Sequence, residues 1–474
     1  MHINNKSIFL FPFLLLIFNH IPSISSQCIE PPLFGKTHNK ACPSVSESQK
    51  KPLNKITNSL VNDDDNSNSM IKIMFTCDEK STPETCKKAD IAFKNAATIV
   101  ENTFDLKVPI AVNASFVKLC GTFIKCAVGQ PEPLGAAAPS RLLPIKDNTD
   151  GETRLFPQAL VKQLQLSEHP EFSPVDIVAG FNSNSNAFWF RGDPPIGKDQ
   201  VDFEIILVHE FLHGLGFITS WDDYFNANAS SLTPTPSFIF TNPEETDGIK
   251  EGPITFTGFQ EYILDRHLVL TKDNSSLTPI AKKINGFAPL NTKFDDQKAF
   301  LDAFTKSPVY KETEIMFKNS ITRGSVAIRL VDGENVLIET GLVPFKPGST
   351  FSHVDFDAFG NTTDFLMRFK APRQVILDDL SPINGDPEYT NPIGPKIISI
   401  FKSLGYPMKE NSSTFKIISN QNQDSLTKPS QNSNKTKLTT EQQQQQQQTN
   451  NAFTITTNTL LLFLSSFLIS NLLL

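Results

Sequence analysis

Two histidines four residues apart constrain the fold of this chain more than any other feature. His209, Glu210 and His213 form the pattern His-Glu-x-x-His within residues 199–217, where apolar residues recur at helical spacing. Side chains four residues apart lie on one helix face, so both imidazoles can bind a single zinc ion. Glu210 is then placed to act as a general base and not as a ligand. The alternative is a chance match, which the helical setting disfavours.

The same segment carries helix start and stop signals. Asp199 is the expected N-cap, and Asp202 adds an acid to the first turn, where the helix dipole favours negative charge. Gly214 and Gly216 fit the helix end, since glycine adopts positive φ without steric cost. We therefore expect the helix over residues 199–217.

A catalytic zinc site usually has three protein ligands, so a further ligand must lie elsewhere. Apart from the N-terminal leader, four other histidines remain: His38, His169, His267 and His353. His353 lies in a loop rich in glycine, serine and proline, which can direct a side chain toward a metal. His267 lies in a segment with helical apolar spacing and is interpreted as a surface or core histidine.

Four stretches carry a resemblance to a known family: 209–217, 348–353, 365–367 and 398–406. With them the sequence resembles metzincin-like zinc metalloproteases of the leishmanolysin type, secreted HExxHGLGF proteins with a distant third histidine and a Met-turn. The resemblance extends over roughly residues 70–407, although only these short stretches are specific.

The resemblance implies that His209, His213 and His353 bind Zn²⁺, that Glu210 is the catalytic base, and that Met367 lies under the metal. Core packing is the alternative role for Met367. Thr219 stands where a short-spaced metzincin would have its third histidine. The sequence departs from the family at Asp364, where glutamate is usual, at Arg368-Phe369 after the methionine, and in the long interval before His353.

We expect an α+β, zincin/metzincin-like fold. Residues 71–217 are predicted to form an N-terminal subdomain with a mixed twisted sheet under two helices, the second being the active-site helix. Residues 218–410 are predicted to form an irregular C-terminal subdomain. Other expected elements are strands at 71–75, 108–112, 116–119, 176–181 and 187–190, helices at 87–102, 158–166 and 395–404, and a loop over 129–157.

The ends of the chain resemble targeting signals. Residues 1–26 have the order of a secretory signal peptide, and 27–70 form a polar segment that is a possible propeptide. Residues 411–451 read as a disordered low-complexity tether. The apolar tail, 452–474, has no basic flank and is interpreted as a GPI-attachment signal, with a retained tail anchor as the alternative.

All six cysteines, at 28, 42, 77, 86, 120 and 126, lie in the first third of the chain. An even number after a signal peptide favours disulfides, and pairing of neighbours (28–42, 77–86 and 120–126) would close short loops. Buried free thiols are the alternative. Sequons such as those at Asn113 and Asn228 suit a glycosylated exterior.

These features predict a secreted or GPI-anchored cell-surface zinc metalloendopeptidase that acts on peptides or proteins, with its membrane contact through the lipid anchor. The net charge of −7, without a basic patch, disfavours nucleic acid as a partner. The rival function is a non-catalytic adhesion or binding protein on the same scaffold. Retention of Glu210 argues against the rival, since a purely structural zinc site does not need that acid.

Overall fold

The computed structural model describes residues 27–30, 38–41, 69–120, 133–225, 229–240, 244–246 and 249–410. The expected signal peptide, tether and apolar tail lie outside these ranges, as does most of the polar segment 27–70. Within the described ranges, no helix has the length and apolarity needed to cross a membrane.

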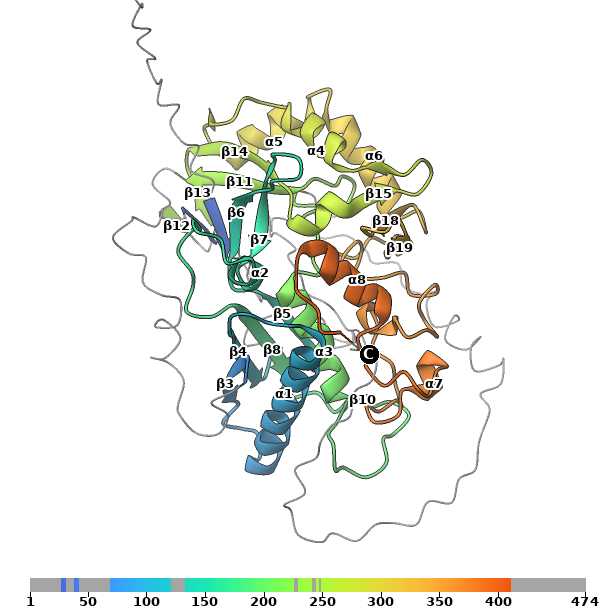
Figure 1. Cartoon of the computed structure of the whole chain (residues 1–474). Helices are drawn as coiled ribbons and strands as arrows, with labels where there is room; N and C mark the ends of the chain where they lie inside the picture. The colour runs from blue at the N-terminus through green and yellow to red at the C-terminus, as the bar shows by residue number, and fades with distance from the viewer. Residues whose placement is uncertain are drawn as a thin grey trace, which may run out of the picture.

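A mixed four-stranded sheet forms the centre of the N-terminal half (Figure 1), in the order β3-β4-β8-β5. Strands β3 (Ile71–Cys77), β4 (Ile110–Val117) and β8 (Ile177–Asn182) run parallel, and β5 (Gly135–Pro139) pairs antiparallel with β8. The mixed sheet predicted from the sequence is therefore confirmed. The expected strands 108–112 and 116–119 are in fact the single strand β4.

Two helices, α1 (Pro83–Thr103) and α3 (Phe203–Leu215), pack against each other and against this sheet. Phe93 of α1 lies at their junction. Its ring centroid is 5.4 Å from that of Phe181 on β8 and 5.9 Å from that of Phe203 on α3. Edge-to-face aromatic contacts of this kind add to the stabilisation from apolar burial. The helix that carries the two histidines is thus anchored in the core.

The expected start of α3 at Asp199 is wrong. Residues Val201–Asp202 form β10, which pairs in parallel with β9 (Phe188–Trp189), and this extended pairing delays the helix to Phe203. Asp202 is the N-cap, because its side chain accepts a hydrogen bond from the amide of Glu204 at 2.8 Å.

The prediction of a loop over residues 129–157 is also wrong. Its described part contains β5, β6 (Leu142–Lys146) and β7 (Thr153–Pro157). Strands β6 and β7 form a hairpin that belongs to a second sheet, in the order β2-β1-β6-β7, with β1 at Gln27–Glu30 and β2 at His38–Ala41. Helix α2 (Gln158–Leu164) follows at once, close to the predicted bounds.

The C-terminal half, expected to be mostly irregular, contains two sheets and several helices joined by long irregular segments. A three-stranded sheet β11-β14-β17 and a four-stranded sheet β16-β15-β18-β19 lie there beside three helices, in the upper half of Figure 1. The strands are β11 (Thr235–Phe240), β12 (Glu244–Thr246), β13 (Ile249–Glu251), β14 (Ile254–Gln260), β15 (Leu268–Leu270), β16 (Ser275–Ser276), β17 (Thr292–Phe294), β18 (Val326–Arg329) and β19 (Asn335–Leu337). The helices are α4 (Thr278–Asn285), α5 (Gln297–Thr305), α6 (Tyr310–Ser320), the 3-10 helices Ile263–His267 and Phe365–Met367, and α7 (Ser381–Asn384).

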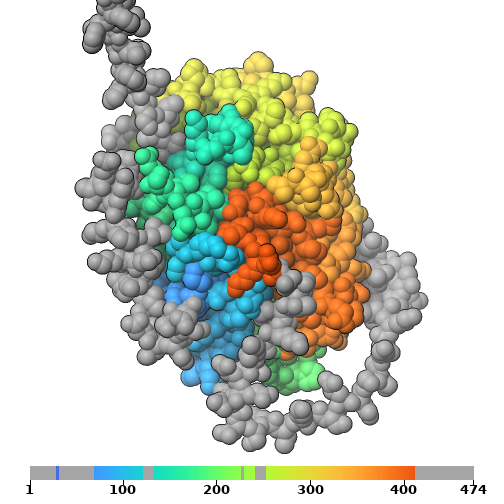
Figure 2. Space-filling view, viewed as in Figure 1, coloured from blue at the N-terminus to red at the C-terminus, as the bar shows by residue number. Residues whose placement is uncertain are grey.

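The last helix, α8 (Pro395–Leu404), has the bounds predicted from the sequence and returns to the N-terminal half. Phe401 packs edge-on against Phe104, which follows α1, with ring centroids 5.2 Å apart. The Tyr406 hydroxyl donates to the carbonyl of Leu215 at 2.7 Å. In Figure 2 this orange-red segment lies directly against the blue N-terminal residues. The end of the described chain therefore covers the C-terminus of α3.

The disulfide Cys77–Cys86 has both of its cysteines within the described residues, and it joins the end of β3 to the first turn of α1. This confirms one of the three neighbour pairings expected from the sequence. Cys28 and Cys120 are also disulfide-bonded, and their partners lie outside the described residues.

Helix α3 packs so closely against β8 at Gly214 that a larger side chain there should destabilise the protein. A Cβ at position 214 would lie 2.4 Å from Cγ2 of Ile177, well inside contact distance. We expect Gly214→Ala to lower the free energy of unfolding by about 1–3 kcal/mol, although alanine is intrinsically the better helix former. Urea unfolding measures this change. The matched control is Gly197→Ala, whose Cβ meets only the end of the flexible Gln200 side chain, at 3.2 Å. Equal or greater stability of Gly214→Ala would contradict the packing argument.

Candidate metal centre

Helix α3 is fixed at its N-terminus by buried polar groups. The second carboxylate oxygen of Asp202 accepts a hydrogen bond from the amide of Leu377 at 2.8 Å, which connects the helix to the C-terminal half. Glu204, itself buried, accepts from Arg191 at 2.6 Å and from Asn95 at 2.6 Å. Because these contacts fix the axial position of α3, they also fix the position of the histidines two turns later.

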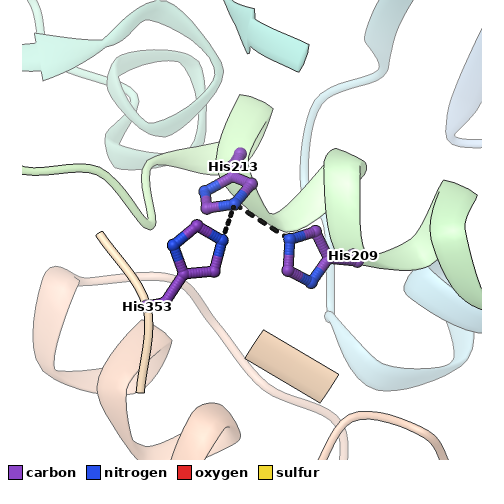
Figure 3. A group of neighbouring side chains, drawn as sticks. All are labelled: His209, His213 and His353. Carbon is purple, nitrogen blue, oxygen red and sulfur yellow. Dashed lines mark hydrogen bonds between the residues drawn. The ribbon is translucent and has the colours of Figure 1, made fainter. Parts of the chain in front are cut away.

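Three imidazoles converge at one point (Figure 3). His209 and His213 project from one face of α3, and His353 reaches them from the C-terminal half. The Nε2 atom of His213 lies 3.1 Å from Nε2 of His209 and 3.3 Å from Nε2 of His353. One nitrogen from each ring lies within 4.8 Å of the others. All three members of this cluster are the candidate ligands that the sequence analysis predicts.

Backbone carbonyls orient each ring through its other nitrogen. Nδ1 of His209 donates to the carbonyl of Leu366 at 2.7 Å, Nδ1 of His213 to Phe217 at 2.8 Å, and Nδ1 of His353 to Ser349 at 3.0 Å. A neutral imidazole has one N–H, and here each Nδ1 carries it. All three Nε2 atoms therefore point lone pairs at one another, so their short separations are not hydrogen bonds.

The segment around His353 is held by backbone pairing on both sides. Glu339 donates its amide to the carbonyl of His353 at 2.8 Å and accepts from the amide of Phe351 at 2.9 Å. The amide of Val354 donates to the carbonyl of Met367 at 2.8 Å. Phe351 has a φ of 66°, in the left-handed region that a bulky side chain rarely adopts, and it is fully buried. This strained turn lets His353 face α3.

Burial keeps the three imidazoles neutral. His213 and His353 are 0% exposed and His209 is 2% exposed. Loss of solvation lowers the pKa of His213 to about 4, with partial compensation from its bond to the Phe217 carbonyl. Burial and then the neighbouring histidines lower the pKa of His353, and burial lowers the pKa of His209 in the same way. Neutral rings, with a lone pair rather than a proton on Nε2, are the protonation state that a metal ion requires.

The geometry fits a tetrahedral metal ion. With bonds of about 2.0–2.1 Å, two nitrogen ligands of tetrahedral zinc lie roughly 3.3 Å apart. The two Nε2–Nε2 separations at His213, 3.1 Å and 3.3 Å, agree with this value. The carbonyls that accept from Nδ1 are typical outer partners of metal-binding histidines, because they fix the tautomer. A set of three imidazoles also favours zinc over magnesium or calcium, which prefer oxygen ligands.

Of the other candidate residues from the sequence, two lie on the segments that carry or orient the imidazoles and two lie outside the cluster. Glu210 lies on α3 between the histidines and is fully buried. Met367 is fully buried and closes the short 3-10 helix Phe365–Met367, one residue after the carbonyl that orients His209. Thr219 does not join the cluster, since its hydroxyl donates to Asp265 at 2.6 Å. His267 contacts Arg266 and lies outside the imidazole cluster.

Sequence reasoning missed the groups that orient the rings. They are backbone carbonyls, at Leu366, Phe217 and Ser349, and a carbonyl has no residue-type signature. Only the Phe217 carbonyl could have been predicted from the sequence, because a glycine precedes it. Gly216 adopts a φ of 117°, and this turn brings the Phe217 carbonyl back to the ring of His213.

Comparison with known proteins shows the family of the chain. A curated relative, the uncharacterized protein PB7E8.01 of Schizosaccharomyces pombe, is 28% identical over 425 residues, which cover 81% of this chain and 72% of the relative. No solved structure matches. A family model described as SPBPB7E8-like matches residues 25–444. This chain therefore belongs to the SPBPB7E8-like family.

Proposed function

We propose that this protein is a zinc-dependent metalloendopeptidase on a metzincin-like scaffold. His209, His213 and His353 bind the ion, and Glu210 is the general base. One observation carries the proposal: Nε2 of His213 lies at ligand spacing from Nε2 of both His209 and His353, and each ring is held in the metal-binding tautomer by a carbonyl. Glu210, which follows His209 on α3, supplies the acid that the chemistry requires.

Within this proposal, each residue has a defined task. The three imidazoles donate lone pairs, and their fixed tautomers avoid the cost of reorganising the site when the ion binds. Bound zinc supplies a Lewis acid that polarises the peptide carbonyl and lowers the pKa of a water molecule. The Glu210 carboxylate accepts the proton of the attacking water and then delivers it to the departing amine. Met367, which is fully buried in the 3-10 helix Phe365–Met367, would keep the floor of the site apolar.

The mixed sheet and its two helices support the zincin scaffold. The histidine helix α3 contacts both β5 and β8, and α1 packs beside it. The third imidazole comes from the C-terminal half, shortly before the buried methionine segment Phe365–Met367. A zincin would place its elements in this order around the metal. The likeness is one of arrangement and supports the activity by analogy.

The rival function, a non-catalytic binding protein with a structural zinc ion, has one observation in its favour. The three histidines and Glu210 are at most 2% exposed, so a peptide cannot reach the ion without movement of the surrounding chain. A structural site would be closed in this way. Glu210 favours the enzyme, because a buried acid beside the ion has no role in a purely structural site.

Metal content and proteolysis together separate the two functions. We expect the purified full chain to contain one zinc ion per molecule and to cleave casein or gelatin. A chelator should stop cleavage, and added zinc should restore it, because the ion supplies the Lewis acid. Elemental analysis and a gel assay measure both results. One zinc with no cleavage would favour the binding protein, whereas absence of zinc would contradict both functions.

A further inference from the structure

Asp364 joins two elements that are separate in the sequence, the 3-10 helix Phe365–Met367 and α8. It immediately precedes the 3-10 helix and is only 2% exposed. Its Oδ1 atom accepts hydrogen bonds from the amides of Lys396 and Ile397, at 2.7 Å and 3.2 Å. Both amides belong to the first turn of α8. Asp364 therefore caps a helix from outside that helix's own sequence.

The start of α8 needs this distant cap because its own residues do not supply one. Gly394 stands at the N-cap position and has no side chain that could accept a hydrogen bond, and Pro395 has no N–H to be satisfied. The amides of Lys396 and Ile397 lie in the first turn, where a helix provides no acceptor of its own. Asp364 supplies the missing acceptor for both.

Close packing also holds Asp364 against α8. A Cβ at Gly394 would lie 2.3 Å from Oδ1 of Asp364, 2.4 Å from the carbonyl oxygen of Thr363 and 2.6 Å from Cα of Asp364. All three distances are below 3.0 Å, closer than a real Cβ approaches another atom. Two of the three atoms belong to the backbone, so a side chain at position 394 would displace the chain that leads into the 3-10 helix.

The same 3-10 helix contacts both segments that carry the imidazoles. The carbonyl of Leu366 accepts from Nδ1 of His209 at 2.7 Å. The carbonyl of Met367 accepts from the amide of Val354 at 2.8 Å, and Val354 follows His353. A shift at the start of this 3-10 helix would therefore move the groups that orient the metal ligands.

The other end of α8 is fixed to the histidine helix. The Tyr406 hydroxyl donates to the carbonyl of Leu215 at 2.7 Å, and the ring centroids of Phe401 and Phe217 are 6.3 Å apart. In Figure 1, α8 lies beside α3. The contacts thus form a closed circuit, because α3 holds α8, α8 holds Asp364, and the 3-10 helix returns to the middle of α3.

We propose that Asp364 is a positioning residue of the metal centre. By capping α8 it fixes the place of the Leu366 carbonyl, and that carbonyl holds the ring of His209 in the orientation and tautomer that bind the ion. The inference rests on the zinc site of the proposed function and adds to it a residue outside the ligand set. If Asp364 served only to cap α8, its loss would lower stability and leave the metal centre unchanged.

Metal binding separates the positioning role from simple helix capping. In Asp364→Ala, the zinc affinity, measured by competition with a chromophoric chelator, should fall about tenfold or more, as is typical when an outer partner of a metal ligand is lost. Asp364→Asn should keep the affinity within about twofold of wild type, because asparagine caps helices as well as aspartate does. The visible spectrum of bound Co²⁺, which reports coordination geometry, should change in the alanine variant alone.

The matched control is Asp296→Ala. Asp296 caps α5 by accepting from the amide of Ala299 at 2.6 Å, and α5 lies at the top of Figure 1, away from α3. This variant should lose thermal stability, as Asp364→Ala should, but keep the wild-type zinc affinity and Co²⁺ spectrum. If Asp364→Ala also loses stability alone, Asp364 is only a helix cap and the proposal is overturned.

A measurement on the metal-free protein makes the inference independent of zinc. Exchange of the imidazole C2 hydrogen for deuterium, followed by mass spectrometry, reports how well the ring of His209 is shielded. The exchange rate should rise severalfold in Asp364→Ala and in Gly394→Ala, which serves if the first variant does not fold, and stay unchanged in Asp296→Ala. A wild-type chain that binds no zinc would refute the proposed function alone. Unchanged exchange at His209 in both junction variants would refute the positioning role.

Discussion

His353→Ala is expected to yield a folded protein that has lost both zinc and peptidase activity. His353 is the only imidazole of the cluster that comes from the C-terminal half, and its Nε2 lies 3.3 Å from that of His213. Loss of an outer partner of a metal ligand typically weakens metal binding by about 10–100-fold, so loss of a direct ligand should cost more than about a hundredfold. Elemental analysis after dialysis against a weak chelator measures the zinc that remains.

The matched control is His267→Ala. His267 contacts Arg266 and lies outside the cluster, so this variant should keep both zinc and activity. Circular dichroism shows whether each variant is folded. A zinc-loaded His353 variant together with a zinc-free His267 variant would reverse the assignment, and the third ligand would then have to be sought elsewhere.

Glu210→Gln should retain zinc and the native fold but lose hydrolysis. The amide has nearly the size and shape of the carboxylate, so the buried position on α3 can accept it. A neutral amide cannot take the proton from the attacking water, and loss of a general base costs about 10²–10⁴-fold in rate. Initial rates on a fluorogenic peptide, at equal zinc content, measure the effect.

Two outcomes would contradict the assigned role of Glu210. A variant that cleaves at the wild-type rate would show that another group is the base. A variant that loses zinc would show that Glu210 supports metal binding, which the three imidazoles should accomplish without it. Glu204→Gln is a useful comparison, because Glu204 lies on the same helix but pairs with Arg191 and Asn95.

The histidine helix was predictable because its signals are local. A two-histidine pattern, apolar residues at helical spacing and Gly216 together define α3 and its end. Helix α8 was predictable for the same reason, with Pro395 at its start and Gly405 after its last residue. The choice of His353 needed more than local sequence, since it came from a loop composition and a family resemblance.

The strands β5 to β7 were missed because their sequences lack the usual strand pattern. Strand β5 reads Gly-Ala-Ala-Ala-Pro, and every residue in it is buried, so neither alternation nor β-branched side chains mark it. Strand β6 contains Pro144, which is tolerated because β1 pairs with β6 only at Leu142. In both cases tertiary packing decides the conformation.

The start of α3 was misplaced for a similar reason. Asp199 and Asp202 are equally good N-caps by composition, and the parallel pairing of β10 with β9 decides between them. That pairing joins residues that a local reading of the sequence does not connect. The second carboxylate oxygen of Asp202 also accepts from Leu377, far along the chain. Long-range contacts of this kind set the bounds that local signals leave open.

The wide sequence separation of the imidazoles also has a consequence during synthesis of the protein. His353 follows His213 by 140 residues, and Tyr406, which caps the end of α3, is made later still. Chains are made from the N-terminus and fold in that order. The helix with both histidines therefore leaves the ribosome long before its third imidazole exists. A nascent or truncated chain that ends before residue 353 carries only two of the three imidazoles, so the complete cluster forms only late in synthesis.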